Sequence, residues 1–396
     1  MTDPVWEAAR DDHASVMDLA GELVRIPSRG GLDSYEPVVN HLADWLGAHG
    51  LAARRLRGPS GEVVAVACEV HGARPGPRYV LDACLDTAPF GAETAWTRSP
   101  VSGAVVDGWL HGRGSADSKA AVAIFAHIGA RLRRDAERMH GAVTLLFDVD
   151  EHTGGFGGAK AYFTDPATGP VAGVMIGYPG PEHVVIGGRG VLRARLHVHG
   201  VAGHSGGSRP TPNAIVKAAA MVQALAEADL PGSPSAQFPP PPRVTVTAVS
   251  GGEGYSVVPD LCTLNIDIRL TPSFDHAGAE KLLRGTVDDI DARWPETAPT
   301  SLELVTRWPP YRLPDTSPLL TALLRAASRY GSAPQPRVAG PSNIGNYLAG
   351  LGIPATAGYG VDYVGLHGTD ERIRIQSITP VQAVYHRALM ELLPIA

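Results

Sequence analysis

Apolar and polar positions along this chain follow two different periods. In some segments apolar side chains recur every three to four residues, which is the spacing of an amphipathic helix. Between them lie short, mostly apolar runs, which are typical of buried strands. Helices are expected at 12–26, 37–50 and 118–134, and strands at 61–70, 78–86, 141–150 and 172–180. This alternation predicts an α/β layer structure whose sheet is largely parallel in its middle.

The pattern changes near residue 188. Residues 190–200 alternate apolar and polar side chains, as a strand with one solvated face does. The order strand, helix, strand, strand, helix, strand follows and predicts a ferredoxin-like sandwich. These elements are expected at 190–200, 213–230, 243–252, 262–272, 277–294 and 301–308. Helical patterns then return, so the sequence predicts one α/β domain, residues 1–187 and 309–396, interrupted by an inserted α+β domain at 188–308.

Composition excludes several classes of partner. The chain has 396 residues and a net charge of −6, without a long basic run, so neither nucleic acid nor an anionic membrane surface is an expected partner. The sequence contains no uninterrupted run of about 18 apolar residues, which is the length that would predict a membrane span. Three widely spaced cysteines and no secretory leader pattern favour a cytoplasmic location. Residues 238–243, FPPPPR, predict a stiff loop, with a peptide-docking segment as the alternative.

Polar side chains that can hold a metal stand where the predicted strands end, the edge at which open α/β sheets bind ligands. They are Cys84, Asp86, Asp117, Asp150, Glu151, His152, Tyr178 and His367. Each has an ordinary alternative: Asp117 as a helix cap, Asp150 to His152 as a solvated turn, His367 as a surface residue. Because they converge from separate segments, and because carboxylate with imidazole suits zinc, the sequence favours a metal site.

The order of these segments resembles a family of di-zinc metallopeptidases. The runs that carry the resemblance are LDTAP, GRGSADSK, DEHTGG, GVAGHSG, GGEGYSVVPD, IDIR and LHGTDERI. The family includes acetylornithine deacetylase, succinyl-diaminopimelate desuccinylase, aminoacylase and carboxypeptidase G. The resemblance covers almost the whole chain. It implies a zinc aminopeptidase-like α/β domain with a mixed sheet, and an inserted domain that acts as lid and dimerisation domain.

The metal ligands depart from the family's pattern. The resemblance implies two zinc ions that share Asp117. Cys84 and Tyr178 stand where one ion takes a His and an acidic ligand, and a phenol is a poor ligand because its pKa is near 10. The second ion's ligands would be Asp117, His152 and His367, which are three good zinc ligands. We therefore expect one zinc ion or none, rather than two.

Three roles are open to Cys84. It can be a further ligand to a single ion, an unligated thiol in the pocket, or a catalytic nucleophile that takes its base from His152 or His367. Asp86 matches the residue that orients the family's ligand His, and with cysteine at position 84 it is expected to lack an imidazole partner. Glu151 matches the general base.

Residues on the substrate side match the family more closely. His204 matches the lid histidine that stabilises the oxyanion from the partner subunit, with a structural turn as the alternative. Arg189 and Arg269 match positions that receive a substrate carboxylate, with surface salt bridges as the alternative. Ser256 and Asn343 stand where the family has Asn and, in many members, Asp. The acyl group therefore cannot be inferred.

The sequence thus predicts an amide hydrolase that acts on an N-acylamino acid or a small peptide-like substrate. One alternative is a metal-independent relative that catalyses acyl transfer, cyclisation or other amide chemistry. The other is a non-catalytic binder of amino-acid-like ligands. A homodimer through the inserted domain is expected in each case.

Overall fold

The structure is a computed structural model that describes residues 3–232 and 234–393. The chain divides into two compact units, which are described separately. Unit 1 contains the described residues up to Ile186, together with Leu313–Arg337 and the chain from Gly352. Unit 2 contains Gly187–Arg312 and Val338–Leu351.

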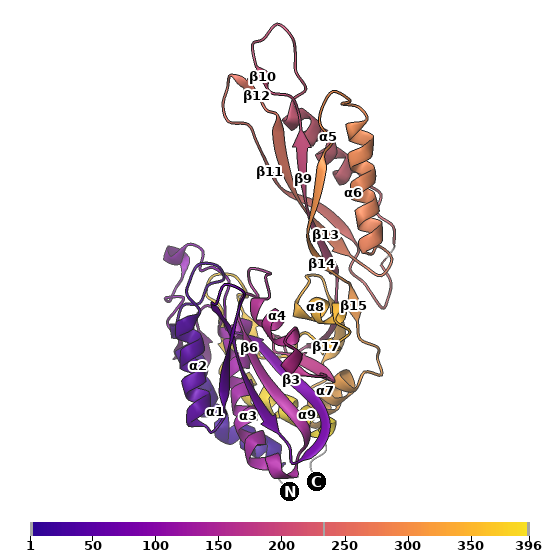
Figure 1. The fold of residues 1–396 in the computed structure, drawn as a ribbon. Coiled ribbons are helices and arrows are strands. Elements are labelled where there is room, and N and C mark those ends of the chain that lie inside the picture. The colour runs from indigo at the N-terminus through magenta and orange to yellow at the C-terminus, as the bar shows by residue number, and fades with distance from the viewer. Residues whose placement is uncertain (1–2, 233, 394–396) are drawn as a thin grey trace. The chain divides into compact units, whose positions relative to one another are not determined.

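A six-stranded mixed sheet forms the centre of unit 1 (Figure 1). Its order is β1-β2-β6-β3-β7-β17. The strands are β1 (Ala53–Arg57), β2 (Val63–His71), β6 (His140–Asp148), β3 (Arg74–Cys84), β7 (Gly173–Ile176) and β17 (Ala355–Thr356). β6, β3, β7 and β17 run parallel, whereas β1 and β2 add to the edge in antiparallel pairs. The predicted fold class, with a sheet that is parallel in its middle, is confirmed.

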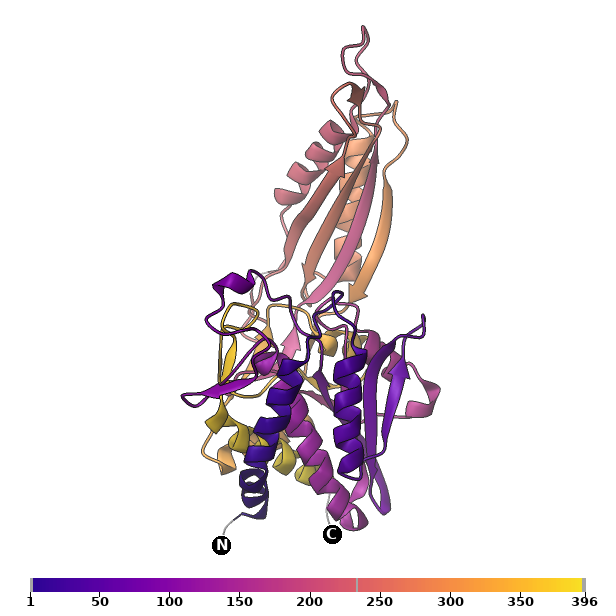
Figure 2. The ribbon, with the colours of Figure 1, turned by 90° about the vertical axis from the view of Figure 1, so that its left-hand side faces the viewer.

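Helices cover both faces of this sheet. The helices of unit 1 are α1 (Pro4–Arg25), α2 (Glu36–Ala48), α3 (Ala120–Asp135), α4 (Gly157–Phe163), α7 (Pro318–Arg329) and α9 (Ile378–Leu392). Figure 2 shows α1, α2 and α3 side by side. α3 lies against the Leu145 face of β6, where Gly129 leaves no room for a Cβ, and α4 lies against the opposite Asp148 face at Gly158. The parallel strands are buried on both faces for this reason.

A second small sheet of unit 1 carries the loops around the site. Its order is β18-β19-β5-β4, and all its pairs are antiparallel. The strands are β4 (Ala104–Val106), β5 (Trp109–His111), β18 (Tyr363–Val364) and β19 (Arg372–Arg374). They were not predicted, because strands of two or three residues are too short to show a period. β8 (His183–Gly188) and β16 (Gln335–Ala339) each pass from one unit into the other.

Unit 2 is a ferredoxin-like sandwich. Its antiparallel sheet has the order β11-β13-β9-β14. The main elements are β9 (Gly190–His199), α5 (Ala214–Ala226), β11 (Arg243–Gly251), β13 (Leu261–Leu270), α6 (His276–Asp291) and β14 (Ser301–Trp308). The short elements are β10 (Gly203–His204), β12 (Val257–Val258), β15 (Tyr311–Arg312) and α8 (Ile344–Gly350). The predicted order of strands and helices is confirmed.

The core of unit 2 explains the alternation that the sequence shows. α5 and α6 contact each other and pack on one face of the sheet (Figures 1 and 2). Apolar positions of β9 and β13, such as Leu196 and Ile266, face these helices and are buried. The intervening positions carry Arg, Asp, Asn, Thr and His on the other face. Among the residues that the structure describes, no helix is both long and apolar enough to cross a membrane.

Candidate metal and catalytic site

Residues from five segments of unit 1 meet beyond the carboxyl end of β3. Cys84 ends β3, and Asp86 follows it. Asp117 lies in a short irregular helical turn, Ser115–Lys119, before α3. Glu151 and His152 follow β6, while Tyr178 and His367 come from later loops. The structure therefore brings together seven of the eight candidates that the sequence predicts in unit 1. The eighth, Asp150, instead accepts the backbone N–H of Gly157 at 3.2 Å.

Asp117, His152 and His367 form the centre of this cluster. Nε2 of His367 lies 2.8 Å from Oδ2 of Asp117, and Nε2 of His152 lies 3.5 Å from the same oxygen. One ligand atom from each residue lies within 4.8 Å of the others. Burial alone would raise the pKa of Asp117, but hydrogen bonds and charge from the two imidazoles outweigh it and hold that pKa well below its usual value.

His152 is held between two carboxylates. Its Nδ1 lies 3.4 Å from Oδ2 of Asp86, and the backbone N–H groups of Glu151 and His152 donate to Asp86 at 3.2 and 3.0 Å. Burial would lower the pKa of His152, but Asp117 and Asp86 raise it to about 11. The expectation that Asp86 lacks an imidazole partner was wrong. The imidazole comes from the turn after β6 rather than from position 84 of the same strand.

Cys84 is a buried thiol beside Asp117. Its Sγ lies 3.8 Å from Oδ1 of Asp117, to which the S–H donates, and Ser118 Oγ donates to the same oxygen at 2.8 Å. Burial raises the pKa of Cys84 well above its usual value, and the charges of Asp117 and Glu151 raise it further. A thiolate nucleophile needs a neighbouring base or a positive field. The surroundings of Cys84 are instead dominated by carboxylates.

Tyr178 lies at the end of β7, where Cys84, Asp117 and Glu151 are close enough to influence it. Burial raises the pKa of its phenol, and the nearby carboxylates raise it further. The phenol therefore stays protonated at neutral pH. The family resemblance implies three ligands for the first metal position, at residues 84, 117 and 178. Of these, only Asp117 has the residue type that the family uses.

Glu151 is placed to exchange protons within the cluster. A carboxylate oxygen lies 3.6 Å from Nδ1 of His152, and Glu151 also shares a 4.8 Å cluster with Cys84 and Asp117. Burial and the charge of Asp117 raise the pKa of Glu151 to about 8, although His152 opposes the shift. A carboxyl group whose pKa lies near neutrality is suited to general acid–base catalysis.

Arg113 and Glu371 support the site, although neither was assigned a role from the sequence. They form an ion pair with both side chains buried. Arg113 Nη2 donates to the carbonyls of His367 and Gly368 at 3.1 and 3.0 Å. Glu371 Oε1 accepts the backbone N–H groups of Gly114 and Ala116, each at 2.9 Å. The pair thus joins the turn that carries Asp117 to the loop that carries His367.

Two further buried carboxyl groups, Asp82 and Asp148, were also missed. Both side chains are fully buried beside the site, and Asp148 is paired in register with Cys84. Burial raises the pKa of Asp82 to about 8, and burial with the charge of Asp82 raises that of Asp148. Both are therefore largely uncharged at neutral pH. Acidic residues inside apolar strand patterns, LDAC and LLFDV, were the available signal.

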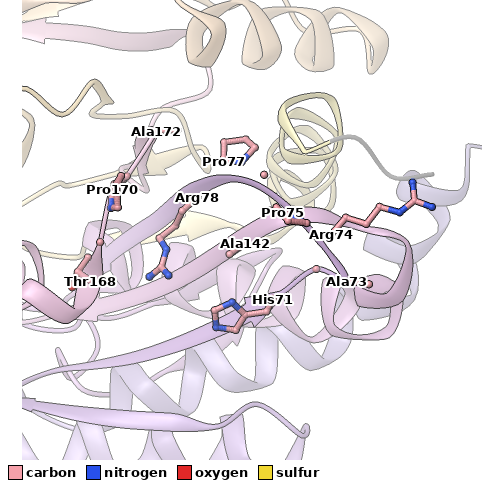
Figure 3. Close-up of a pocket in the computed structure, with 15 residues that line it drawn as sticks. His71, Ala73, Arg74, Pro75, Pro77, Arg78, Ala142, Thr168, Pro170 and Ala172 are labelled. Atoms are coloured by element: carbon pink, nitrogen blue, oxygen red, sulfur yellow. The ribbon is translucent and has the colours of Figure 1, made fainter.

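A pocket of about 490 Å³ opens beside the metal-type cluster. Residues 88–91, Arg113, His152 and His367 line it. A second pocket, of about 660 Å³, lies around the start of β3 and is lined by Arg74, Arg78 and their neighbours (Figure 3). Arg78 donates to Glu69 at 2.9 Å, and none of the predicted site residues lines this second pocket. Of these two pockets, the smaller one is therefore the one that predicted site residues line.

The remaining predicted residues belong to unit 2. His204 lies in β10 and is exposed, and Gly206 N–H donates to its Nδ1 at 3.0 Å. Ser256 is also exposed, and its carbonyl accepts the N–H of Ser205. Asn343 caps α8 by accepting the N–H of Gly345 at 2.8 Å. This capping bond is an ordinary structural role for Asn343.

Arg189 and Arg269 lie in unit 2 at the other end of β9 from His204. Arg269 pairs with Asp267, with Nε 2.7 Å from Oδ1, and donates to Ser342 Oγ at 3.3 Å. Arg189 donates to the carbonyls of Gly340 and Pro241, at 2.7 and 2.9 Å. Arg269 therefore takes part in a salt bridge. Within the part of the chain that the structure describes, the hydrogen bonds of the Arg189 guanidinium go to backbone carbonyls.

The residues present fit one metal ion. Two imidazoles and a carboxylate are a common three-ligand set for zinc and leave a coordination position open. The ring nitrogens of His152 are buried, and neither makes a hydrogen bond of regular geometry to another residue in the described part of the chain. Asp86 orients this imidazole, as carboxylates beside ligand histidines do. Metal binding would use a ring nitrogen of His152 that otherwise lacks a hydrogen bond of regular geometry.

Comparisons with known proteins agree with the fold. Residues 80–391 match Peptidase family M20/M25/M40. A succinyl-diaminopimelate desuccinylase from Cereibacter sphaeroides is 28% identical over 316 residues, covering 77% of this chain and 81% of the relative.

Solved structures show the same fold. An M20 family metallo-carboxypeptidase from Sulfolobus solfataricus superposes with a TM-score of 0.76 at 17% identity, covering 95% of this chain and 98% of the other. A protein described as a dinuclear metal binding peptidase from the M20 family, from Bacillus subtilis, has a TM-score of 0.71 at 17% identity. The latter comparison covers 98% of this chain and all of the other.

The α/β unit and its cluster of carboxylates and imidazoles define a metallopeptidase-like hydrolase. The chain belongs to Peptidase family M20/M25/M40, whose members hydrolyse amide bonds. The predicted family and enzyme class are confirmed.

Proposed function

We propose that this protein hydrolyses the amide bond of an N-acylamino acid or a small peptide-like substrate, with one zinc ion rather than two. The observation that carries the proposal is the cluster of Asp117, His152 and His367, with Glu151 beside it. The cluster supplies three metal ligands and a proton-transfer group, and two of its members, His152 and His367, line the pocket. The desuccinylase relative supports an acylated amino acid as the substrate class.

Asp117, His152 and His367 would hold the ion, and Asp86 would orient His152. When bound, zinc supplies a Lewis acid that polarises a carbonyl and makes water more acidic. A second ion is disfavoured because its other ligands would be Cys84 and Tyr178. Both groups have raised pKa values, so each would have to lose a proton that its surroundings retain.

Glu151 is the proposed proton carrier. The oxygen of water forms a bond to the carbonyl carbon of the amide, and Glu151 accepts the proton that the water loses. The C–N bond then breaks, and Glu151 delivers that proton to the leaving nitrogen. The products are a carboxylic acid and an amine, and transfer of the acid's proton to the amine gives a carboxylate and an ammonium ion. The environment of Glu151 favours this exchange because its pKa is close to neutrality.

Unit 2 is proposed to act as the lid. His204 is exposed on β10, which leaves its imidazole available to donate to a developing oxyanion. Arg189 and Arg269 would receive a substrate carboxylate, a task that suits the planar guanidinium. Ser256 and Asn343 are weaker candidates for substrate contacts, since Asn343 already caps α8.

Unit 2 also carries a surface suited to homodimerisation. β11 is an edge strand of nine residues, and an unpaired edge is a template for a second strand. Exposed apolar residues lie on β11, on and just before β12, at the start of β13 and at the start of α5: Val249, Tyr255, Val257, Leu261, Ile215 and Val216. We propose a homodimer through this edge. His204, paired in register with Val257, would then lie beside the interface.

A metal-independent relative that catalyses acyl transfer or cyclisation is the second candidate. One observation favours it: His152, with its pKa raised to about 11, is a cation between Asp86 and Asp117 and supplies positive charge at the proposed metal position. We propose a cytoplasmic location in either case, consistent with three buried, unpaired cysteines.

One experiment separates the two candidates. Protein purified without chelators is assayed for metal content and for hydrolysis of a panel of N-acylamino acids and dipeptides. We expect chelation to abolish hydrolysis, and about one equivalent of zinc per chain to restore it. Full activity in metal-free protein would favour the second candidate.

A further inference from the structure

The two carboxylate oxygens of Asp117 have different kinds of partner. Oδ2 lies 2.8 Å from Nε2 of His367 and 3.5 Å from Nε2 of His152. Oδ1 instead accepts the O–H of Ser118 at 2.8 Å and the S–H of Cys84 at 3.8 Å. A carboxylate oxygen has two lone pairs, so these two donors can engage both of those on Oδ1. The imidazoles, which are proposed metal ligands, thus face one oxygen, and two uncharged donors face the other.

Ser118 is the stronger of these two donors. A separation of 2.8 Å is ordinary for an O–H···O hydrogen bond, whereas a thiol is a weak donor. The side chain of Ser118 is buried, and within the part of the chain that the structure describes its hydroxyl has Oδ1 of Asp117 as its acceptor. An unpaired hydroxyl is costly away from water, so this bond should persist. It therefore restrains the Asp117 carboxylate against rotation about its Cβ–Cγ bond.

The backbone of the turn that carries Asp117 is held by a different group, Glu371. Oε1 of Glu371 accepts the N–H groups of Gly114 and Ala116, each at 2.9 Å, and that of Asp117 at 3.4 Å. These bonds place the Cα of Asp117, but they do not fix the terminal torsion of its side chain, which is broad for aspartate. The orientation of the carboxylate is thus left to side-chain contacts. Ser118 supplies the shortest of these that does not come from a proposed metal ligand.

A second serine of the same turn makes no such bond. Ser115 lies three residues before Ser118 in the run GSADSK, and it is fully buried. No hydrogen-bond partner of its hydroxyl occurs among the residues that the structure describes. The hydroxyl of Ser115 therefore does not hold Asp117. Because the two serines share residue type, turn and burial, Ser115 is a matched control for Ser118.

We propose that Ser118 is a positioning residue for the metal site. Its hydroxyl engages Oδ1 of Asp117 and so leaves Oδ2, on the side of His152 and His367, as the one oxygen that would hold the ion. Ser118 is neither a ligand nor a contact of the reacting atoms, and it acts through Asp117. Groups that orient a metal ligand in this way increase metal affinity. This inference rests on the proposed one-ion site, and it adds the residue that makes Asp117 a one-oxygen ligand.

The first test measures the zinc affinity of the full chain by competition with a chromophoric chelator. Ser118→Ala removes the hydroxyl, Ser118→Thr keeps it, and Ser115→Ala is the control. We expect Ser118→Ala to weaken zinc binding by about 10- to 100-fold, the range for groups that orient metal ligands. Ser118→Thr should recover most of that loss, and Ser115→Ala should bind zinc as the wild type does. Wild-type affinity in Ser118→Ala would overturn the inference, as would equal weakening by Ser115→Ala or no recovery in Ser118→Thr.

The second test uses cobalt(II) in place of zinc, because its visible spectrum reports coordination. Four-coordinate cobalt(II) absorbs more strongly than five- or six-coordinate cobalt(II). With Asp117 bound through one oxygen, the three protein ligands and one water should give the four-coordinate spectrum in the wild type. In Ser118→Ala, Oδ1 is free to join the ion, so the absorption should weaken, whereas Ser115→Ala should keep the wild-type spectrum. An unchanged spectrum in Ser118→Ala would overturn the inference.

Zinc affinity and hydrolysis together separate this inference from the proposed function. Zinc binding that depends on Ser118, in a protein that hydrolyses none of the substrate panel, would support the positioning role and contradict the hydrolase proposal. Zinc-dependent hydrolysis with equal zinc affinity in Ser118→Ala and the wild type would support the hydrolase and overturn the positioning role. Thermal unfolding of the metal-free variants is measured alongside, and Ser118→Ala and Ser115→Ala should unfold at similar temperatures. Early unfolding of Ser118→Ala alone, with a wild-type cobalt spectrum, would leave Ser118 a structural role only.

Discussion

Asp86 accepts the backbone N–H of His152 at 3.0 Å, and the same carboxylate oxygen lies 3.4 Å from Nδ1 of that residue. One carboxylate thus fixes both the backbone and the ring of a proposed metal ligand. The Nε2 of His152 is thereby directed to Asp117, whose Oδ2 lies 3.5 Å away. A site that has a cysteine where the family has a ligand histidine still orients an imidazole through Asp86. This relationship underlies the first prediction.

Metal content should be about one zinc ion per chain. His152→Ala should lose the ion, because it removes a ligand from the set of Asp117, His152 and His367. Cys84→Ser should lower zinc affinity only if the thiol is a further ligand. Elemental analysis of dialysed protein measures both. Two tightly bound ions per chain would contradict the proposed arrangement, and active protein without metal would favour the metal-independent candidate.

Glu151→Gln should lower kcat by about 100-fold or more, because the amide side chain keeps the shape but cannot accept the proton. Zinc content should stay close to that of the wild type, since Glu151 is not one of the three proposed ligands. Steady-state kinetics on an identified substrate and elemental analysis measure the two effects. Turnover at the wild-type rate would show that another group carries the proton.

Arg113→Lys should weaken zinc binding by about 10- to 100-fold, the range measured for groups that orient metal ligands. Lysine keeps the charge beside Glu371 but lacks the fork that also reaches the carbonyls of His367 and Gly368. His367 has φ of 57°, a left-handed conformation that needs such support. Competition with a chromophoric chelator measures the affinity.

Arg131→Lys is the matched control for that experiment. Arg131 makes a two-pronged contact with Asp12, with Nε and Nη2 at 3.0 and 2.6 Å, and neither residue belongs to the site. Both variants should lower the melting temperature, but only Arg113→Lys should release zinc more readily. If the two variants bind zinc equally well, Arg113 has a structural role only.

Val249→Asp should convert the proposed homodimer to a monomer. The side chain of Val249 is exposed on the edge strand β11, and a buried charge at an interface is costly without a partner. Val305→Asp is the control, because Val305 is exposed to a similar degree on β14, the other edge of the same sheet. Sedimentation at micromolar concentration measures both. A monomeric wild type would contradict the dimer and any role of His204 in the partner's site.

Stability should fall below about pH 6.5 because of His386. Burial lowers the pKa of this imidazole from 6.5 to about 4, so the unfolded chain binds more protons than the native protein between these values. Stability therefore rises with pH across this window, and the full loss, about 3 kcal/mol, is reached below pH 4. In His386→Leu, the free energy of unfolding, measured by urea denaturation between pH 4.5 and 7, should rise less steeply with pH than in the wild type. An unchanged slope would assign the acid sensitivity to other groups.

Hydrophobic periodicity was sufficient to predict the main sheet of each of the two units. The alternation of helices and buried strands predicted the mixed sheet of unit 1, and the period-two pattern of residues 190–200 predicted the half-solvated sheet of unit 2. Short strands such as β4 and β18 were missed because two or three residues contain no measurable period. Asp82 and Asp148 were missed because the same apolar pattern made their strands look wholly ordinary.

The sequence by itself determined which chemical groups stand at the strand ends, because the carboxyl ends of parallel strands meet at one edge of a sheet. It showed Asp117, His152 and His367 as a zinc-type set, and it showed that positions 84 and 178 depart from the family. Only the tertiary structure decided that Asp86 orients His152, that Arg113 joins two loops, and that Cys84 lies beside Asp117. These contacts depend on the register between segments far apart in the chain, and local periodicity carries no information about that register.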